Sequence, residues 1–189
     1  LMVIFRGVNL EYFDSNSVSE NQKNKLVEDW KINTDKFIIL LPGRLTEWKG
    51  QEMFIESLNH LVEQHNKQNF HAIILGSNQG RKVFLKKLLN LSQRFRLNNK
   101  LTFVNQLKNM PAAYKVADIV VSASIKPESF GRVAVEAQAM SKPIIASNIG
   151  GSKETILKDK SGMLFTSGNS KELALVLNKM MELDKDSLI

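Results

Sequence analysis

The chain has 189 residues, of which 43% are hydrophobic and 24% charged, and 26 basic against 19 acidic residues give a net charge of +7. These values are typical of a globular domain, and the basic balance favours anionic partners such as phosphate ligands, nucleic acid or an acidic membrane face. The absence of cysteine excludes disulfides, a cysteine nucleophile and Cys-ligated zinc, and three histidines without metal-ligand spacing give no support to a zinc site. The lack of cysteine also fits a cytoplasmic protein. No apolar run approaches the ~18–20 residues of a membrane span, and no signal peptide is visible.

Short apolar runs alternate with longer amphipathic segments along the chain. We predict strands at Met2–Phe5, Phe37–Leu41, Phe70–Leu75, Leu101–Val104, Asp118–Ser122, Pro143–Ala146 and Met163–Phe165. We predict helices near Glu20–Trp30, Gln51–His65, Lys82–Phe95, Ala112–Val116, Arg132–Met140, Lys153–Leu157 and Lys171–Leu183. The strand segments are rich in Ile, Val and Leu without alternation, which indicates a sheet covered on both faces. The repeated order predicts an α/β fold with a single Rossmann-like, doubly wound parallel sheet over residues 20–189, preceded by a strand and linker at 1–19.

Two cations follow the strand at 37–41. In doubly wound sheets, ligands bind outside the carboxyl ends of the strands, so the loops that follow the strands should carry function. Arg44 and Lys49 lie in one such loop, and Gly50 begins the next helix. Two cations beside a helix N-terminus can neutralise a diphosphate leaving group. The alternative is two solvated surface charges, the commoner fate of any Lys or Arg.

Two glutamates flank the most informative segment, which follows the strand at 118–122. Glu128 precedes a glycine-containing turn and Glu136 lies on the predicted helix that follows. Between them, Ser129, Phe130 and Gly131 place free backbone N–H groups at a helix N-terminus, which binds phosphate or other anions. The pattern suits a ligand with a phosphate in its middle and hydroxyls at both ends, such as a nucleotide-sugar.

Other interpretations of this glutamate pair are open. Glycoside hydrolases hold two carboxyl groups about 5–9.5 Å apart, whereas eight residues on a continuous helix rise by about 12 Å. The helix starts only near Gly131, so the separation is undetermined, but the intervening anion site favours binding of one ligand at two ends. In a purely structural interpretation, Glu128 caps a helix and Glu136 is solvated. Against this, Glu136 lies among Val and Ala residues, where a lone carboxylate is either costly or functional.

The remaining motifs are less specific. The turn Asn148–Glu154 puts two glycines before a short helix and is also compatible with a plain strand-to-helix turn capped by Ser152. The chain has no G-x-G-x-x-G fingerprint and no Walker A lysine. The basic helix at 82–95 has an apolar stripe that could lie on an acidic membrane, although we favour packing against the sheet.

Together these motifs resemble the C-terminal domain of family 4 glycosyltransferases, which are retaining enzymes of the GT-B fold. The matching segments cover nearly all of the chain and keep their order and spacing. They are Val3–Phe13, like the segment that enters that domain; Gly43–Gly50, like its phosphate loop; Glu128–Glu136, like its E-x7-E motif; Ala146–Glu154, like the turn that follows; and Ser161–Phe165, like a late strand. The chain departs from the family pattern at Pro42, in the spacing of the Gly76 loop, and at Lys153.

The resemblance implies a role for each candidate residue. It implies that Arg44 and Lys49 hold the diphosphate of the donor, that Glu128 binds hydroxyls of the transferred sugar, and that Glu136 binds the ribose hydroxyls. It also implies that the backbone N–H groups of Phe130, Gly131 and Arg132 donate hydrogen bonds to the phosphates. The base of the donor would lie against Val104–Gln106. Relatives of this kind need no metal and no cofactor beyond the donor.

The resemblance also implies a partner, because GT-B enzymes place their active site between two Rossmann-like domains. We therefore expect the donor-binding half of a hexosyltransferase-type enzyme, inactive without an N-terminal acceptor domain that this sequence lacks. The expected function is transfer from a nucleoside-diphosphate sugar to a glycan or lipid-linked acceptor in polysaccharide biosynthesis, in the cytoplasm or peripherally on the inner membrane face. The alternative is a non-catalytic sugar-nucleotide-binding or membrane-tethering module. No pattern in the chain supports nucleic-acid binding.

Overall fold

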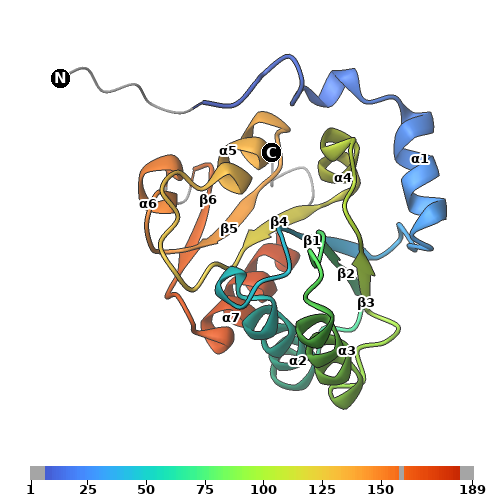
Figure 1. Ribbon diagram of the computed structural model, residues 1–189, viewed down its shortest axis with the longest axis vertical. Coiled ribbons are helices and arrows are strands. Elements are labelled where there is room, and N and C mark those ends of the chain that lie inside the picture. The colour runs from blue at the N-terminus through green and yellow to red at the C-terminus, as the bar shows by residue number, and fades with distance from the viewer. Residues whose placement is uncertain (1–6, 158–159, 184–189) are drawn as a thin grey trace.

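The structure, a computed structural model, describes residues 7–157 and 160–183. The described residues form one six-stranded, fully parallel sheet with the strand order β3-β2-β1-β4-β5-β6 (Figure 1). The strands are β1 (Phe37–Pro42), β2 (Phe70–Leu75), β3 (Leu101–Val104), β4 (Ile119–Ser122), β5 (Ile144–Ser147) and β6 (Gly162–Phe165). This sheet confirms the predicted Rossmann-like, doubly wound class. The strand predicted at Met2–Phe5 lies outside the described residues.

Helices connect consecutive strands, as the alternating pattern predicts. They are α1 (Glu20–Asp29), α2 (Gln51–His65), α3 (Lys82–Arg94), α4 (Met110–Val116), α5 (Arg132–Ala139), α6 (Ser152–Thr155) and α7 (Ser170–Glu182), with two 3-10 turns, η1 (Ser15–Ser17) and η2 (Glu47–Lys49). Local chemistry sets several ends. Ser19 and Gln22 form a capping box at the start of α1, and Asn66 ends α2 in the left-handed conformation.

The helices form a layer on each face of the sheet (Figure 1). Helices α2, α3 and α7 cover one face, where they pack on alternate β1 residues such as Ile39, and α4 and α5 cover the other face with α1 outside α4. The apolar stripe of α3 faces this core, with Phe84 and Leu88 buried, so it is not available to a membrane surface. Across the described ranges, no helix is long and apolar enough to cross a membrane.

The strand order determines where a ligand can bind. From β1 the chain builds outward through β2 and β3, and it then returns through α4 to place β4 on the opposite side of β1. The direction of winding reverses between β1 and β4, and the loops after these two strands diverge at that point. Open parallel sheets bind their ligands in the crevice that such a reversal creates.

Candidate functional site

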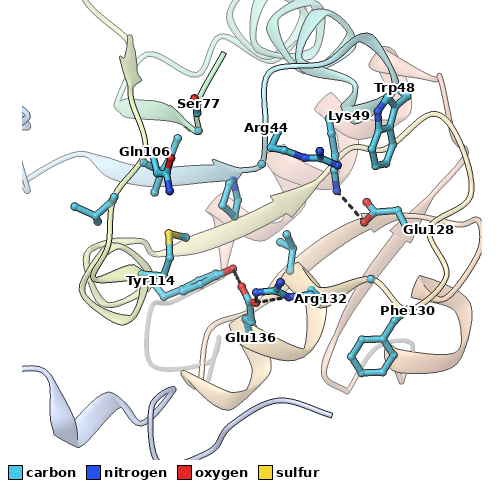
Figure 2. A pocket seen from close by; sticks show the side chains of 18 of the residues that line it. Arg44, Trp48, Lys49, Ser77, Gln106, Tyr114, Glu128, Phe130, Arg132 and Glu136 are labelled. Carbon is cyan, nitrogen blue, oxygen red and sulfur yellow. Dashed lines mark hydrogen bonds and ion pairs between the residues drawn. The ribbon is translucent and has the colours of Figure 1, made fainter. Parts of the chain in front are cut away.

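A cleft of about 740 Å³ lies at this reversal point (Figure 2). Its walls are the loops after β1, β2, β3 and β4 together with α4 and the start of α5. Among the described residues that line it are two carboxylates, Glu128 and Glu136, and three cations, Arg44, Lys49 and Arg132. The cleft therefore combines hydrogen-bond acceptors with an excess of positive charge, as an anionic ligand rich in hydroxyls requires.

The first carboxylate, Glu128, is held on both oxygens. Lys49 Nζ lies 2.8 Å from Glu128 Oε2, and the Ser124 hydroxyl donates to Glu128 Oε1. The side chains of Lys49 and Glu128 are only 14% and 17% exposed, so the two predicted groups form a largely desolvated ion pair. The interpretation of Glu128 as a helix cap is wrong, because α5 begins at Arg132 and no side chain of the described residues caps it.

The second carboxylate, Glu136, is 7% exposed and also has both oxygens engaged. The Tyr114 hydroxyl donates to Oε2 at 2.7 Å, and Arg132 donates to Oε1 from Nε at 3.1 Å and from Nη2 at 2.9 Å. Figure 2 shows these groups converging from α4 and α5. The interpretation of Glu136 as a solvated helix residue is wrong, because the side chain is buried. The hydrogen bonds from Tyr114 and Arg132 compensate the cost of burying the charge.

The N-terminus of α5 lies between the two carboxylates. Its N-cap is Gly131, in the left-handed conformation with φ of 75°, and Phe130, Gly131 and Arg132 all line the cleft. A helix start without a side-chain cap leaves backbone N–H groups free to bind an anion, and the helix dipole adds to the attraction. The helix N-terminus predicted from the sequence is therefore present at these residues, without a side-chain cap.

Two glycines of the turn after β5, Gly150 and Gly151, pack directly against the backbone of the loop that carries Glu128. The Gly151 N–H donates to the Glu128 carbonyl at 2.8 Å, and a Cβ at Gly151 would lie 2.6–2.7 Å from the backbone of Phe130. A Cβ at Gly150 would lie 2.5 Å from the Glu128 carbonyl oxygen. The turn at 148–154 is thus a platform for the Glu128 loop, and Ser152 is the first residue of α6, not its N-cap.

The β1 loop is joined to the β4 loop in a similar way. Ile125 N–H donates to the Trp48 carbonyl at 2.8 Å, and a Cβ at Gly50 would lie 1.9 Å from the Ala123 carbonyl oxygen. Lys49 passes beside Trp48, with its ammonium 4.7 Å from the ring centroid. The close approach brings Lys49 of one loop to the Glu128 carboxylate of the other.

The other predicted site residues, Arg44 and the segment expected against the base, lie at different places relative to the cleft. Arg44 is exposed and its guanidinium points toward the same part of the cleft as Lys49 (Figure 2). Of the residues predicted against a base, Gln106 lines the cleft, whereas Val104 ends β3 and packs against the core. Across the described part of the chain, no group of three or more His, Asp or Glu side chains could hold a metal ion.

Sequence reasoning did not identify Ser124 and Tyr114. Both donate hydroxyl hydrogen bonds to the two glutamates, and both are at most 5% exposed. The signal for Tyr114 was present, because a polar-tipped aromatic in a short alanine-containing helix needs a partner for its hydroxyl. The identity of that partner follows only from the fold.

Comparison with known proteins agrees with this geometry. The family described as Glycosyl transferases group 1 matches residues 22–188. An uncharacterised glycosyltransferase of Methanocaldococcus jannaschii is 30% identical over 95% of this chain and 44% of its own length.

Solved structures give the same picture. A glycosyltransferase of Rickettsia africae superposes with a TM-score of 0.92 at 33% identity, over 100% of this chain and 49% of the other. HepE of Anabaena, solved in complex with UDP and glucose, has a TM-score of 0.86 at 29% identity, over 99% of this chain and 48% of the other. The chain thus spans less than half the length of these relatives, and its fold matches one half of a GT-B glycosyltransferase.

Proposed function

This chain belongs to the group 1 glycosyltransferases, and we propose that it is the donor-binding half of a retaining, family 4 enzyme. The proposed donor is a nucleoside-diphosphate sugar, bound in the cleft between the β1 and β4 loops. One observation carries the proposal: two fixed carboxylates lie on either side of a helix N-terminus and a pair of cations, in a single cleft. The UDP and glucose bound by the relative from Anabaena support the choice of ligand.

The diphosphate is assigned to the centre of the cleft. Arg44 and Lys49 supply positive charge there, and the backbone N–H groups at Phe130, Gly131 and Arg132 supply directed hydrogen bonds. Lys49 is already placed within 2.8 Å of Glu128, so it can contact phosphate while its partner contacts the adjoining sugar. These roles make the cations the groups that stabilise charge on the departing diphosphate.

The two glutamates are assigned to the hydroxyl-bearing ends of the donor. Glu128 accepts hydrogen bonds from the transferred sugar, and Glu136 accepts them from the ribose. Both carboxylates are held by neighbouring donors, and carboxylate oxygens are strong acceptors for hydrogen bonds from hydroxyl groups. The residues that follow β3, Gln106 and Leu107, form the wall next to the ribose site and are assigned to the base.

In the proposed reaction, the bond between the sugar's anomeric carbon and the diphosphate breaks and a bond to an acceptor hydroxyl oxygen forms on the same face. The acceptor proton passes to the departing diphosphate oxygen, whose charge Arg44 and Lys49 neutralise. We propose that the acceptor, a glycan or lipid-linked sugar of cell-envelope polysaccharide synthesis, is held by a second Rossmann-like domain. No step in this scheme calls on a metal ion.

Calorimetric titration of the chain with UDP, GDP and ADP, in a buffer containing EDTA, tests the proposal. We expect one nucleotide to bind, and we expect Arg44→Ala to weaken it roughly tenfold because one charge-assisted contact to the diphosphate is lost. Lys86→Ala is the matched control, since it removes the same charge from an exposed position on α3 outside the cleft. The proposal fails if no nucleotide binds and if Arg44→Ala in a two-domain enzyme keeps normal transfer activity.

A further inference from the structure

Tyr114 stands out because it is fully buried and still reaches the cleft. It lies on α4 and is 0% exposed, and it is the largest fully buried side chain among the described residues. Its hydroxyl is 2.7 Å from Glu136 Oε2. Burial, and then the negative charge of Glu136, raise the pKa of Tyr114 well above its ordinary value, so the phenol keeps its proton and donates a hydrogen bond to the carboxylate.

The two partners of Glu136 differ in how firmly they hold it. The Arg132 side chain is 74% exposed and lies one turn before Glu136 on the same helix, at the edge of the proposed phosphate site. Tyr114 lies on a different helix, α4, and its rigid ring carries one polar group, the hydroxyl. A long exposed side chain loses more conformational entropy on being fixed than a buried ring does. Of the two partners, Tyr114 is therefore the one that is more firmly held.

The ring of Tyr114 is in turn packed against the segment that enters the domain, residues 7–19. Phe13, which is 8% exposed, meets it edge-to-face with centroids 5.9 Å apart. The Tyr12 hydroxyl donates to a backbone carbonyl in the loop before α4 at 2.8 Å, and Lys115 Nζ donates to two carbonyls of the entering segment. The entering segment, α4 and the second carboxylate thus form one continuous set of contacts.

We infer that Tyr114 is a positioning residue, which orients the Glu136 carboxylate for the ribose hydroxyls of the donor and is itself held in place by Phe13 of the entering segment. The inference rests on the proposed role of Glu136. Because Glu136 is buried and its other oxygen is taken by Arg132, the remaining lone pairs can face the cleft only while Oε2 is fixed from the α4 side. Loss of the Tyr114 hydroxyl frees the carboxylate to rotate, and ribose recognition weakens.

Tyr114→Phe tests the inference, since it removes the hydroxyl and keeps the ring packing on Phe13. The ligands are the tightest binder among UDP, GDP and ADP and its 2′,3′-dideoxy counterpart, which lacks the hydroxyls assigned to Glu136. We expect Tyr114→Phe to weaken the ribonucleotide roughly tenfold and the dideoxynucleotide by less than about twofold. Ser57→Ala is the matched control, because it removes a fully buried hydroxyl on α2 outside the cleft and the entering segment, and it should change neither affinity.

Two further variants separate positioning from general damage. In a Glu136→Ala background, Tyr114→Phe should have no further effect on the ribonucleotide, because the group it orients is gone. Phe13→Leu, which keeps an apolar side chain but loses the edge-to-face contact, should weaken the ribonucleotide by about threefold and spare the dideoxynucleotide. Thermal unfolding of each variant shows whether the chain is still folded.

Equal weakening of both nucleotides by Tyr114→Phe, or unchanged ribonucleotide affinity, would overturn the inference while leaving the proposed function intact. The same holds if the Tyr114→Phe effect persists without Glu136. If the unmodified chain binds none of the three nucleotides, the proposed function fails first and the inference fails with it. Comparing the ribonucleotide with its dideoxy counterpart therefore distinguishes failure of the inference from failure of the proposed function.

Discussion

At the scale of single residues, the cleft depends on charges that are buried only because they are paired. Lys49 and Glu128 come from loops after different strands and are both largely shielded from water. Desolvating two such charges is costly, and their mutual attraction together with the Ser124 hydrogen bond offsets that cost. Removal of one partner leaves the other buried without compensation, which is worse than removing both.

This pairing predicts a non-additive effect on stability. Lys49→Met should lower the free energy of unfolding by about 1–3 kcal/mol, and Lys49→Met combined with Glu128→Gln should recover part of that loss. Urea denaturation measures each value. Lys23→Met breaks an ion pair with Glu20 that is far more exposed, at 32% and 63%, and should leave stability essentially unchanged. Additive losses in the double variant would show that the pair is not coupled.

At the scale of elements, the cleft is built from loops held at backbone contact distance. The turn after β5 supports the Glu128 loop through Gly150 and Gly151, and the start of α2 meets the end of β4 at Gly50. Glycine is required at these contacts because any side chain would overlap a backbone atom that belongs to another loop. The glycines therefore set the spacing of the site although they contribute no chemistry of their own.

Gly151→Ala tests this platform. The added methyl would approach the Phe130 carbonyl carbon and Cα at 2.6 and 2.7 Å, so the Glu128 loop must move. We expect a loss of about 1–3 kcal/mol in unfolding free energy, measured by urea denaturation, and roughly tenfold weaker nucleotide binding, measured by calorimetry. Gly7→Ala is the control, because no described atom lies within 4 Å of its added Cβ. Unchanged binding in Gly151→Ala would show that the turn does not position the loop.

At the scale of the whole molecule, charge and topology act together. The chain carries a net charge of +7, and its cleft combines three cations with two carboxylates at the point where the winding of the sheet reverses. An excess of positive charge around a concave site raises the local concentration of an anionic ligand.

This electrostatic contribution predicts a salt dependence that is specific to the phosphates. Nucleoside-diphosphate affinity should fall by about tenfold between roughly 0.05 and 0.5 M NaCl, because added ions screen the cleft cations. Calorimetry at several salt concentrations measures this change. The corresponding nucleoside, which has no phosphate, should bind more weakly and respond little to salt. Equal responses of the two ligands would argue against a diphosphate site among Arg44, Lys49 and Arg132.

The elements were predictable because their signals are local. The bounds of α2 and β2 match the predicted ranges, since capping, turn residues and apolar periodicity act within a few residues. The gathering of Lys49, Glu128 and Glu136 into one cleft was also predictable in outline, because the loops after parallel strands meet at one edge of the sheet. The structural role of the turn at 148–154 was not, because it depends on a contact with a loop some twenty residues away.

The sequence by itself determined the fold class, the edge of the sheet where the cleft lies, and the types of residue that line it. The tertiary structure decided which groups pair: Lys49 with Glu128, Tyr114 with Glu136, and Gly151 with the backbone of the Glu128 loop. Periodicity is a property of neighbouring residues, whereas these partners are separated by 22 positions or more along the chain and meet only when the β1–β4 adjacency and the packing of α4 on α1 bring them together.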